Sequence, residues 1–148
     1  MTIHHPIIIE RTFAVPAHIV WKALTDDTEI KKWYFDLPGF KAELGYQFTF
    51  EGGKDPEHTY IHLCEITEVV EQHKLTYSWR YKGYEGISYV TFELFETPDK
   101  SSTLLKLIHS GLHTFPSSNP DLAEENFVAG WTDIIHKSLQ QYITQLTN

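Results

Sequence analysis

The chain has 148 residues, 14% of them aromatic, and its 20 acidic and 12 basic residues give a formal net charge of -8. This length suits one domain, residues 1–148, with a core of its own. The acidic balance argues against a nucleic-acid partner, whose phosphates need cations, and no apolar run of about 18 residues supports membrane insertion.

The N-terminal segment and the cysteine content predict a cytoplasmic protein. Residues 1–6 lack the basic and apolar regions of a signal peptide. The single cysteine, Cys64, cannot form an internal disulfide, which suits a reducing compartment. Because it lies among strand-like residues, Cys64 is interpreted as a small buried hydrophobe rather than a reactive thiol.

The first quarter of the chain predicts a strand followed by two short helices. The β-branched run 7–15 indicates a strand that stops at Pro16. Helical spacing then begins, with Pro16 at or near the first turn. A second helix is expected from Thr28 to Trp33, with cap oxygens in the Asp26–Thr28 cluster.

Glu10 and Arg11 are neighbours on the first strand and therefore point to opposite faces. If this strand is central, one of the two faces the interior. A buried Arg11 would need a carboxylate partner. The sequence leaves open which of the two residues faces inward.

From residue 46 to residue 109 the apolar period is two, which indicates consecutive antiparallel strands. One strand alternates from Tyr46 to Glu51, and the next runs from about Thr59 to Val70. The third alternates from Leu75 to Tyr81, with one apolar face and one expected to be wet. Two more follow over 87–96 and 103–109, joined by Gly- and Pro-containing turns.

The last element is a long amphipathic helix, expected from just after Asp121 to about Leu146. Its predicted apolar stripe has spacings of three and four and consists of Phe127, Trp131, Ile134, Ile135, Ser138, Tyr142 and Leu146. Gly130 inside a helix costs about 1 kcal/mol relative to alanine. We interpret it as a point where the helix closely approaches a strand, rather than as a hinge.

Segregated strands and helices predict an α+β fold, with a curved antiparallel sheet of about six to seven strands wrapped around the C-terminal helix. Such a sheet can leave a void between helix and strands.

Several motifs occur in order over residues 8 to 146. They are Arg11-Thr12-Phe13 with Pro16 and Val20-Trp21; Leu24-Thr25-Asp26 with Trp33; Glu65-Ile66-Thr67-Glu68-Val69 with Leu75-Thr76-Tyr77-Ser78-Trp79; and His109-Ser110-Gly111 with Gly130-Trp131. Together they resemble bacterial relatives of the activator of the 90-kDa heat-shock protein ATPase, in the START-like, birch-pollen-allergen-like (SRPBCC) superfamily. The resemblance implies a helix-grip fold with a cavity for a lipid, sterol, phenolic or polyketide. It carries over no catalytic set.

The candidate ligand-binding residues lie on the apolar faces of their elements. They are Trp33, Phe48, Phe50, Tyr77, Trp79, Phe92, His109, Trp131, Ile135 and Tyr142. An ordinary packed aromatic core is the alternative for each of them. Buried Tyr and Trp need hydrogen-bond partners, however, which a ligand with a few oxygens could supply. His109 is interpreted as bonding either a ligand or neighbouring backbone.

No metal or cofactor is expected. His109 and His113 have the spacing of helical metal ligands, but Gly111 and the preceding strand pattern argue against a helix there. No nucleophile signature is present.

The leading hypothesis is therefore non-catalytic binding of a small hydrophobic molecule, planar aromatic, polyketide-like or lipid-like, by a monomer or weak dimer. One alternative is a cyclase or hydrolase with His109 or a buried carboxylate as acid/base. Another is a chaperone-interacting module with an exposed apolar patch, associated with the stress response.

Overall fold

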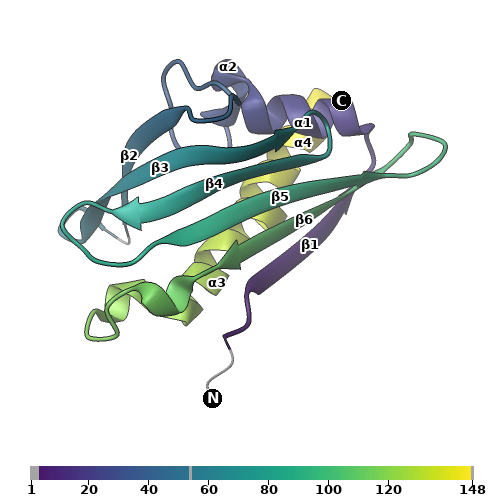
Figure 1. The fold of residues 1–148 in the computed structure, drawn as a ribbon. Helices are drawn as coiled ribbons and strands as arrows, with labels where there is room; N and C mark the ends of the chain where they lie inside the picture. Colours follow the sequence, from purple (N-terminus) through teal and green to yellow (C-terminus); the bar gives the residue numbers. More distant parts are fainter. Residues whose placement is uncertain (1–3, 54, 148) are drawn as a thin grey trace.

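The computed structural model describes residues 4–53 and 55–147, which form a curved antiparallel sheet in the strand order β1-β6-β5-β4-β3-β2 (Figure 1). The strands are β1 (Ile7–Phe13), β2 (Gln47–Gly53), β3 (Thr59–Val70), β4 (Lys74–Tyr81), β5 (Ser88–Glu96) and β6 (Thr103–Ser110). The strands from β2 to β6 are joined in chain order. Only the β1–β6 pair joins segments far apart in sequence.

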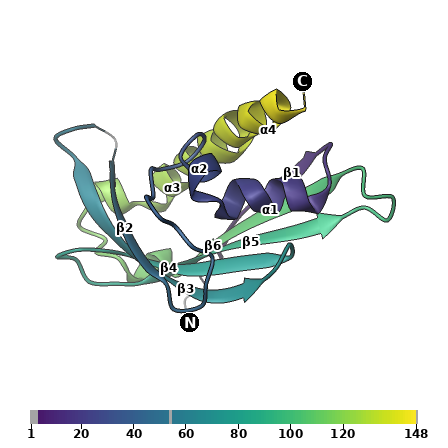
Figure 2. The same ribbon diagram turned by 90° about the horizontal axis from the view of Figure 1, so that it is seen from above.

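Two groups of helices cover one face of this sheet (Figure 2). The first group is α1 (Ala17–Thr25) and α2 (Asp27–Ile30). The second is α3 (Glu124–Asp133), a π-helical stretch η3 (Ile134–Leu139) and α4 (Gln140–Leu146), preceded by the short 3-10 turns η1 (Leu112–Thr114) and η2 (Pro120–Leu122). The predicted helix-grip α+β architecture is confirmed.

The second short helix ends earlier than the sequence predicted. Asp26 caps it as expected, because its carboxylate accepts a hydrogen bond of 2.8 Å from the Thr28 amide. The α-helical part is only one turn long, and the chain continues as turns to Trp33. The Trp33 indole donates to the Ala23 carbonyl at 2.8 Å, so it ties the end of this turn to α1.

The side chains on the outward face of β4 are less exposed to solvent than the sequence predicted. Thr76 and Ser78 lie opposite the apolar face, yet they are only 9% and 8% exposed. The Thr76 hydroxyl lies 3.0 Å from that of Thr91, and Ser78 donates to the Glu65 carbonyl at 3.5 Å. β4 has strands on both sides, so small side chains there are shielded by cross-strand neighbours.

Arg11, not Glu10, lies on the inward face of β1, where it is half-buried. Its Nε donates to Gln140 Oε1 at 3.1 Å, and its Nη1 donates to His136 Nδ1 at 3.0 Å. Neither partner is the carboxylate that the sequence argument required. Partial exposure to water explains this, because a half-buried guanidinium keeps part of its hydration. Arg11 therefore joins β1 to the C-terminal helix through an amide and an imidazole.

The buried stripe of the C-terminal helix shifts by one residue after Ile135. Leu139 and Ile143 are buried, whereas the predicted stripe members Ser138 and Leu146 are half-buried and 47% exposed. The π-helical stretch η3 accounts for the shift, because its wider turn holds more residues than an α-helical turn. A constant helical period could not predict this change of face.

Gly130 does not mark a close approach to a strand, so that interpretation was wrong. A Cβ at this position would meet no atom within 4 Å apart from its chain neighbours and the backbone of its own helix, and the residue is exposed on α3. Its backbone angle φ is not in the left-handed region, which favours glycine.

We therefore expect Gly130→Ala to raise the free energy of unfolding by about 1 kcal/mol, because alanine restricts the unfolded chain without a clash in the helix. Urea denaturation measures the change. Gly111→Ala is the matched control and should destabilise, since φ is +85° there and the added Cβ would lie 2.9 Å from the Ile87 carbonyl oxygen. A destabilised Gly130→Ala would contradict the open space seen beside α3.

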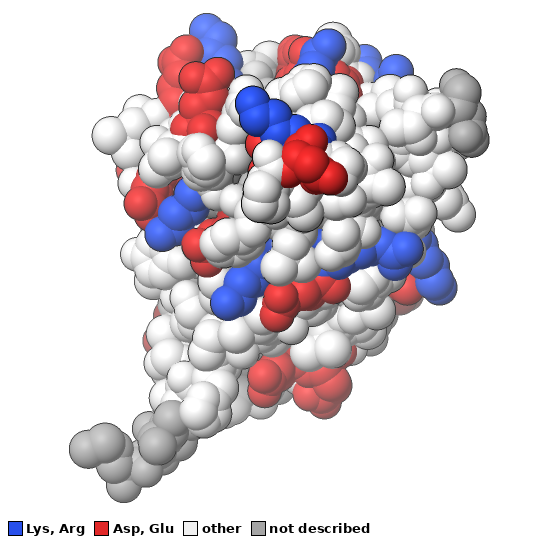
Figure 3. Space-filling view, turned by 90° about the vertical axis from the view of Figure 1, so that its right-hand side faces the viewer, with Lys and Arg blue, Asp and Glu red and all other residues white. Residues whose placement is uncertain are grey.

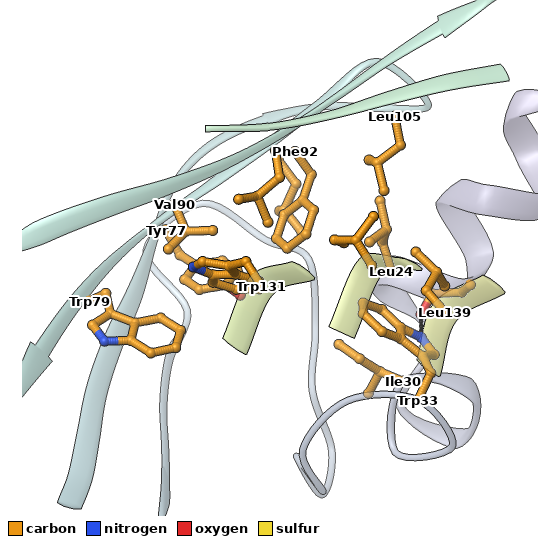
Figure 4. Close-up of a cluster of buried hydrophobic side chains, with 14 of the residues drawn as sticks. Leu24, Ile30, Trp33, Tyr77, Trp79, Val90, Phe92, Leu105, Trp131 and Leu139 are labelled. Carbon is orange, nitrogen blue, oxygen red and sulfur yellow. Dashed lines mark hydrogen bonds between the residues drawn. The ribbon is translucent and has the colours of Figure 1, made fainter. Parts of the chain in front are cut away.

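Aromatic and aliphatic side chains from both layers form one core. Figure 4 shows Trp131 of α3 among Tyr77, Val90 and Phe92 of the sheet. On the surface, the side view in Figure 3 has Lys and Arg interspersed with Asp and Glu, without a continuous basic area among the described residues of that face. This mixture is typical of a solvated surface.

Candidate ligand cavity

A cavity of about 160 Å³ lies between the start of the C-terminal helical segment and the β2–β3–β4 side of the sheet. η2, α3 and the first residue of η3 form one wall, and the strands form the other. Rings predominate in its lining: Phe35, Tyr60, Trp79, Tyr81, Phe127 and Trp131. An apolar cavity of about 150 Å³ is large enough for benzene. The space therefore matches one aromatic ring.

His62 is the buried polar side chain of this lining. It is 5% exposed, and its Nδ1 lies 3.0 Å from the Tyr60 carbonyl and 3.2 Å from the Phe50 carbonyl. Since carbonyl oxygens only accept, Nδ1 carries the hydrogen. Burial lowers the pKa of His62 to about 4, so the ring is neutral at pH 7 and Nε2 keeps its lone pair.

Three neighbouring rings hold the His62 imidazole in place. It stacks on Phe50, with ring centres 4.3 Å apart, and it meets Trp79 and Tyr81 edge-on at 4.8 Å each. The Trp79 indole donates to the Tyr81 hydroxyl at 2.9 Å. Burial raises the pKa of Tyr81 well above its usual value, so the hydroxyl stays protonated. This side of the cavity is therefore pre-formed by packing.

A polar cluster borders the cavity at η2. The Tyr60 hydroxyl donates to Asp121 Oδ2 at 2.7 Å and accepts from Asn119 Nδ2 at 3.2 Å. The hydrogen bond to Asp121 is the main reason that the pKa of Tyr60 is raised. Asn119 also caps η2 by accepting from the Asp121 amide. These bonds connect β3 to the segment that precedes α3.

His109 lies behind the cavity and has protein partners on both ring nitrogens. The Trp131 indole donates to Nδ1 at 2.9 Å, so Nε2 carries the hydrogen and donates to Ser88 Oγ at 2.8 Å. Ser88 donates in turn to the Trp79 carbonyl at 3.0 Å. Burial lowers the pKa of His109 to about 3. The neutral imidazole thus connects α3, β6, β5 and β4.

All ten candidate residues predicted from the sequence are buried, and two of them, Trp79 and Trp131, line this cavity. The other eight lie outside its lining: Trp33, Phe48, Phe50, Tyr77, Phe92, His109, Ile135 and Tyr142. The two tyrosines of this set find their partners within the protein. The Tyr77 hydroxyl lies 2.8 Å from that of Tyr34, and Tyr142 donates to Glu29 Oε1 at 2.7 Å.

The sequence interpretation missed several lining residues, above all His62. A signal for His62 was present, because it alternates with Cys64 and Ile66 on the inward face of β3. For Phe35 and Leu122 no periodic signal exists, since both lie outside the regular strands and the long helix. Only the folded chain brings them to the same cavity.

Cys64 lies in the core, 5% exposed, and burial raises the pKa of its thiol well above the usual value. The described residues contain no group of three or more side chains arranged to hold a metal ion. None of the helices formed by these residues combines the length and apolar character needed to cross a membrane.

Solved structures of known proteins resemble this chain over nearly its whole length. Protein MLL2253 from Mesorhizobium loti is 25% identical, with a TM-score of 0.74, over 95% of this chain and 97% of that one. CalU16 from Micromonospora echinospora is 27% identical, with a TM-score of 0.69, over 93% and 75%. No curated protein matches.

DynU16, a protein of the dynemicin biosynthetic locus, has a TM-score of 0.74 at 19% identity, over 95% of this chain. The match covers 47% of DynU16, about half of its length, and this likeness concerns the fold alone. The model of the Activator of Hsp90 ATPase homolog 1-like protein family matches residues 14–144. Since this match runs from the end of β1 into α4, the chain belongs to the Activator of Hsp90 ATPase homolog 1-like family.

Proposed function

We propose that this protein binds a small aromatic molecule in the cavity beneath α3, without chemical conversion. The observation that carries the proposal is the aromatic-walled cavity of about 160 Å³ between α3 and the sheet, with the exposed Gly130 at its edge. One aromatic ring fills a space of this volume, so the ligand that we propose is a single ring.

Binding is favoured over catalysis because the buried histidines are poor acid/base groups at neutral pH. The pKa values of His62 and His109, about 4 and about 3, lie far from the value near 7 that suits proton transfer. Both nitrogens of His109 are already bonded to protein groups. Cys64 is held as a thiol by the raised pKa that burial causes, so it is a weak nucleophile.

The test is a titration of the protein with benzene, toluene and indole, followed through the indole N–H resonances of Trp79 and Trp131. Saturable shifts at these two resonances support the proposal. The resonance of Trp21 on α1 is the internal reference, because Trp21 does not line the cavity. The absence of saturable shifts for all three compounds would refute the proposal.

Gly130→Leu should block this binding and leave the fold intact. Gly130 borders the cavity and has open space beside it, so a leucine side chain can extend over the cavity, and leucine is a good helix former. We expect at least a tenfold loss of affinity for toluene, measured by calorimetry. Ala129→Leu, one residue away on the exposed surface of α3 and outside the lining, is the matched control and should bind as the natural chain does.

A further inference from the structure

His62 lines the cavity with one ring nitrogen that the described residues leave unbonded. Its Nδ1 donates to two backbone carbonyls, so Nε2 is an acceptor, and it has no partner among the described residues. Yet no fully buried side-chain nitrogen or oxygen of the described chain lacks a partner. Nε2 therefore contacts the free space of the cavity, where a bound molecule can reach it.

Tyr81 lines the same cavity and has an unused hydrogen-bond donor. Its hydroxyl oxygen accepts from the Trp79 indole, while its own hydrogen has no acceptor among the residues that the structure describes. The rings of His62 and Tyr81 meet edge-on with centres 4.8 Å apart. One polar substituent on a bound ring can thus lie close to both side chains.

We propose that the cavity selects a ring that carries a hydroxyl group, a phenol, which donates to His62 Nε2 and accepts from the Tyr81 hydroxyl. This inference rests on the proposed ligand-binding function. A plain hydrocarbon ring would cover His62 Nε2 without giving this acceptor a partner, which lowers affinity. A carboxylate has no hydrogen to donate to Nε2, so an aromatic acid fits less well than a phenol.

The experiment compares phenol, toluene and benzoate as probes of the full chain by titration calorimetry. Toluene has nearly the size of phenol but forms no hydrogen bond. We expect the natural chain to bind phenol at least as tightly as toluene, and benzoate much more weakly. His62→Phe keeps an aromatic ring and should weaken phenol binding about tenfold, the effect of one lost hydrogen bond. Its affinity for toluene should not fall.

Two further variants complete the design. His18→Phe, on the exposed side of α1, is the matched control and should change neither affinity. Tyr81→Phe removes the donor and should weaken phenol binding severalfold without affecting toluene. It provides a second test if His62→Phe does not fold, which circular dichroism would reveal.

The outcomes separate this inference from the function on which it rests. The proposed selection of a phenol is wrong if toluene binds the natural chain more tightly than phenol does. It is also wrong if His62→Phe and Tyr81→Phe bind phenol with unchanged affinity. In both cases the proposed binding of an aromatic ring is still supported. If neither toluene nor phenol binds, the proposed function is wrong and the inference fails with it.

Discussion

Replacing Trp131 with alanine should lower the free energy of unfolding by about 3 to 5 kcal/mol, the usual cost of deleting a buried large aromatic side chain. Trp131 is 2% exposed and stands at the centre of the core. Its ring lies 5.7 Å from that of Trp79 and 6.1 Å from those of Tyr34 and Phe92. The substitution also removes the indole N–H that His109 Nδ1 accepts, which leaves a buried acceptor without a partner.

Urea denaturation of Trp131→Ala and two further variants separates the loss of packing from the loss of the hydrogen bond. Trp131→Phe keeps most of the apolar contact and removes the hydrogen bond to His109, so it should cost about 1 to 3 kcal/mol. Val128→Ala, on the exposed side of the same helix, is the control and should change stability by less than about 0.5 kcal/mol. A loss below about 2 kcal/mol in Trp131→Ala would mean that the indole is not packed as described.

Lowering the pH from 6.5 to 4 should destabilise the protein strongly, because two histidines are buried in their neutral form. Burial lowers the pKa of His62 to about 4 and that of His109 to about 3, against an ordinary value of 6.5. Between these values the unfolded chain binds more protons than the folded chain, so stability falls as the pH falls. At about 1.36 kcal/mol per pKa unit, the loss between pH 6.5 and pH 4 is about 3 kcal/mol for each of the two histidines.

This effect is comparable with the whole stability of a typical domain, about 5 to 15 kcal/mol. We therefore expect acid unfolding to begin above pH 4. Three carboxylates affect stability at lower pH. Hydrogen bonds from nearby side chains lower the pKa values of Asp26, Asp55 and Asp99. Their contribution to the free energy of unfolding is therefore lost only as the pH falls below about 3.8, the ordinary carboxyl pKa. The two causes are thus separable by pH.

The measurement is the slope of unfolding free energy against pH between 4.5 and 6.5. His109→Gln replaces the imidazole with an amide that does not titrate, and it should reduce the slope even though it lowers stability at pH 7. His18→Gln removes an exposed histidine and should leave the slope unchanged. Equal slopes for His109→Gln and the natural chain would show that His109 does not remain neutral in the folded protein.

The strands were the part of the fold most open to prediction from sequence. A period of two marked the limits of β3 at Thr59 and Val70, where the structure places them. The ordered motifs also predict the family, and the family model, which matches residues 14–144, confirms it. Local patterns sufficed here because strand alternation and turn residues act between near neighbours in the chain.

The candidate site was less open to prediction. The sequence could place Trp79 and Trp131 on inward faces, but it could not show which inward rings border empty space. A void depends on the fit of side chains from several elements, here β3, η2 and α3, which are distant in sequence. The π-helical turn in η3 further changed which residues face the sheet.

Sequence patterns alone predict the sheet, the helix that crosses it, the family, and the abundance of rings in the interior. Those properties follow from the period of apolar residues and from composition. The folded chain, in contrast, sets the bonds of His109 to Trp131 and Ser88 and leaves one nitrogen of His62 free toward the cavity. Hydrogen-bond partners are set by contacts between distant segments, so two buried strand histidines with similar patterns acquired different chemistry.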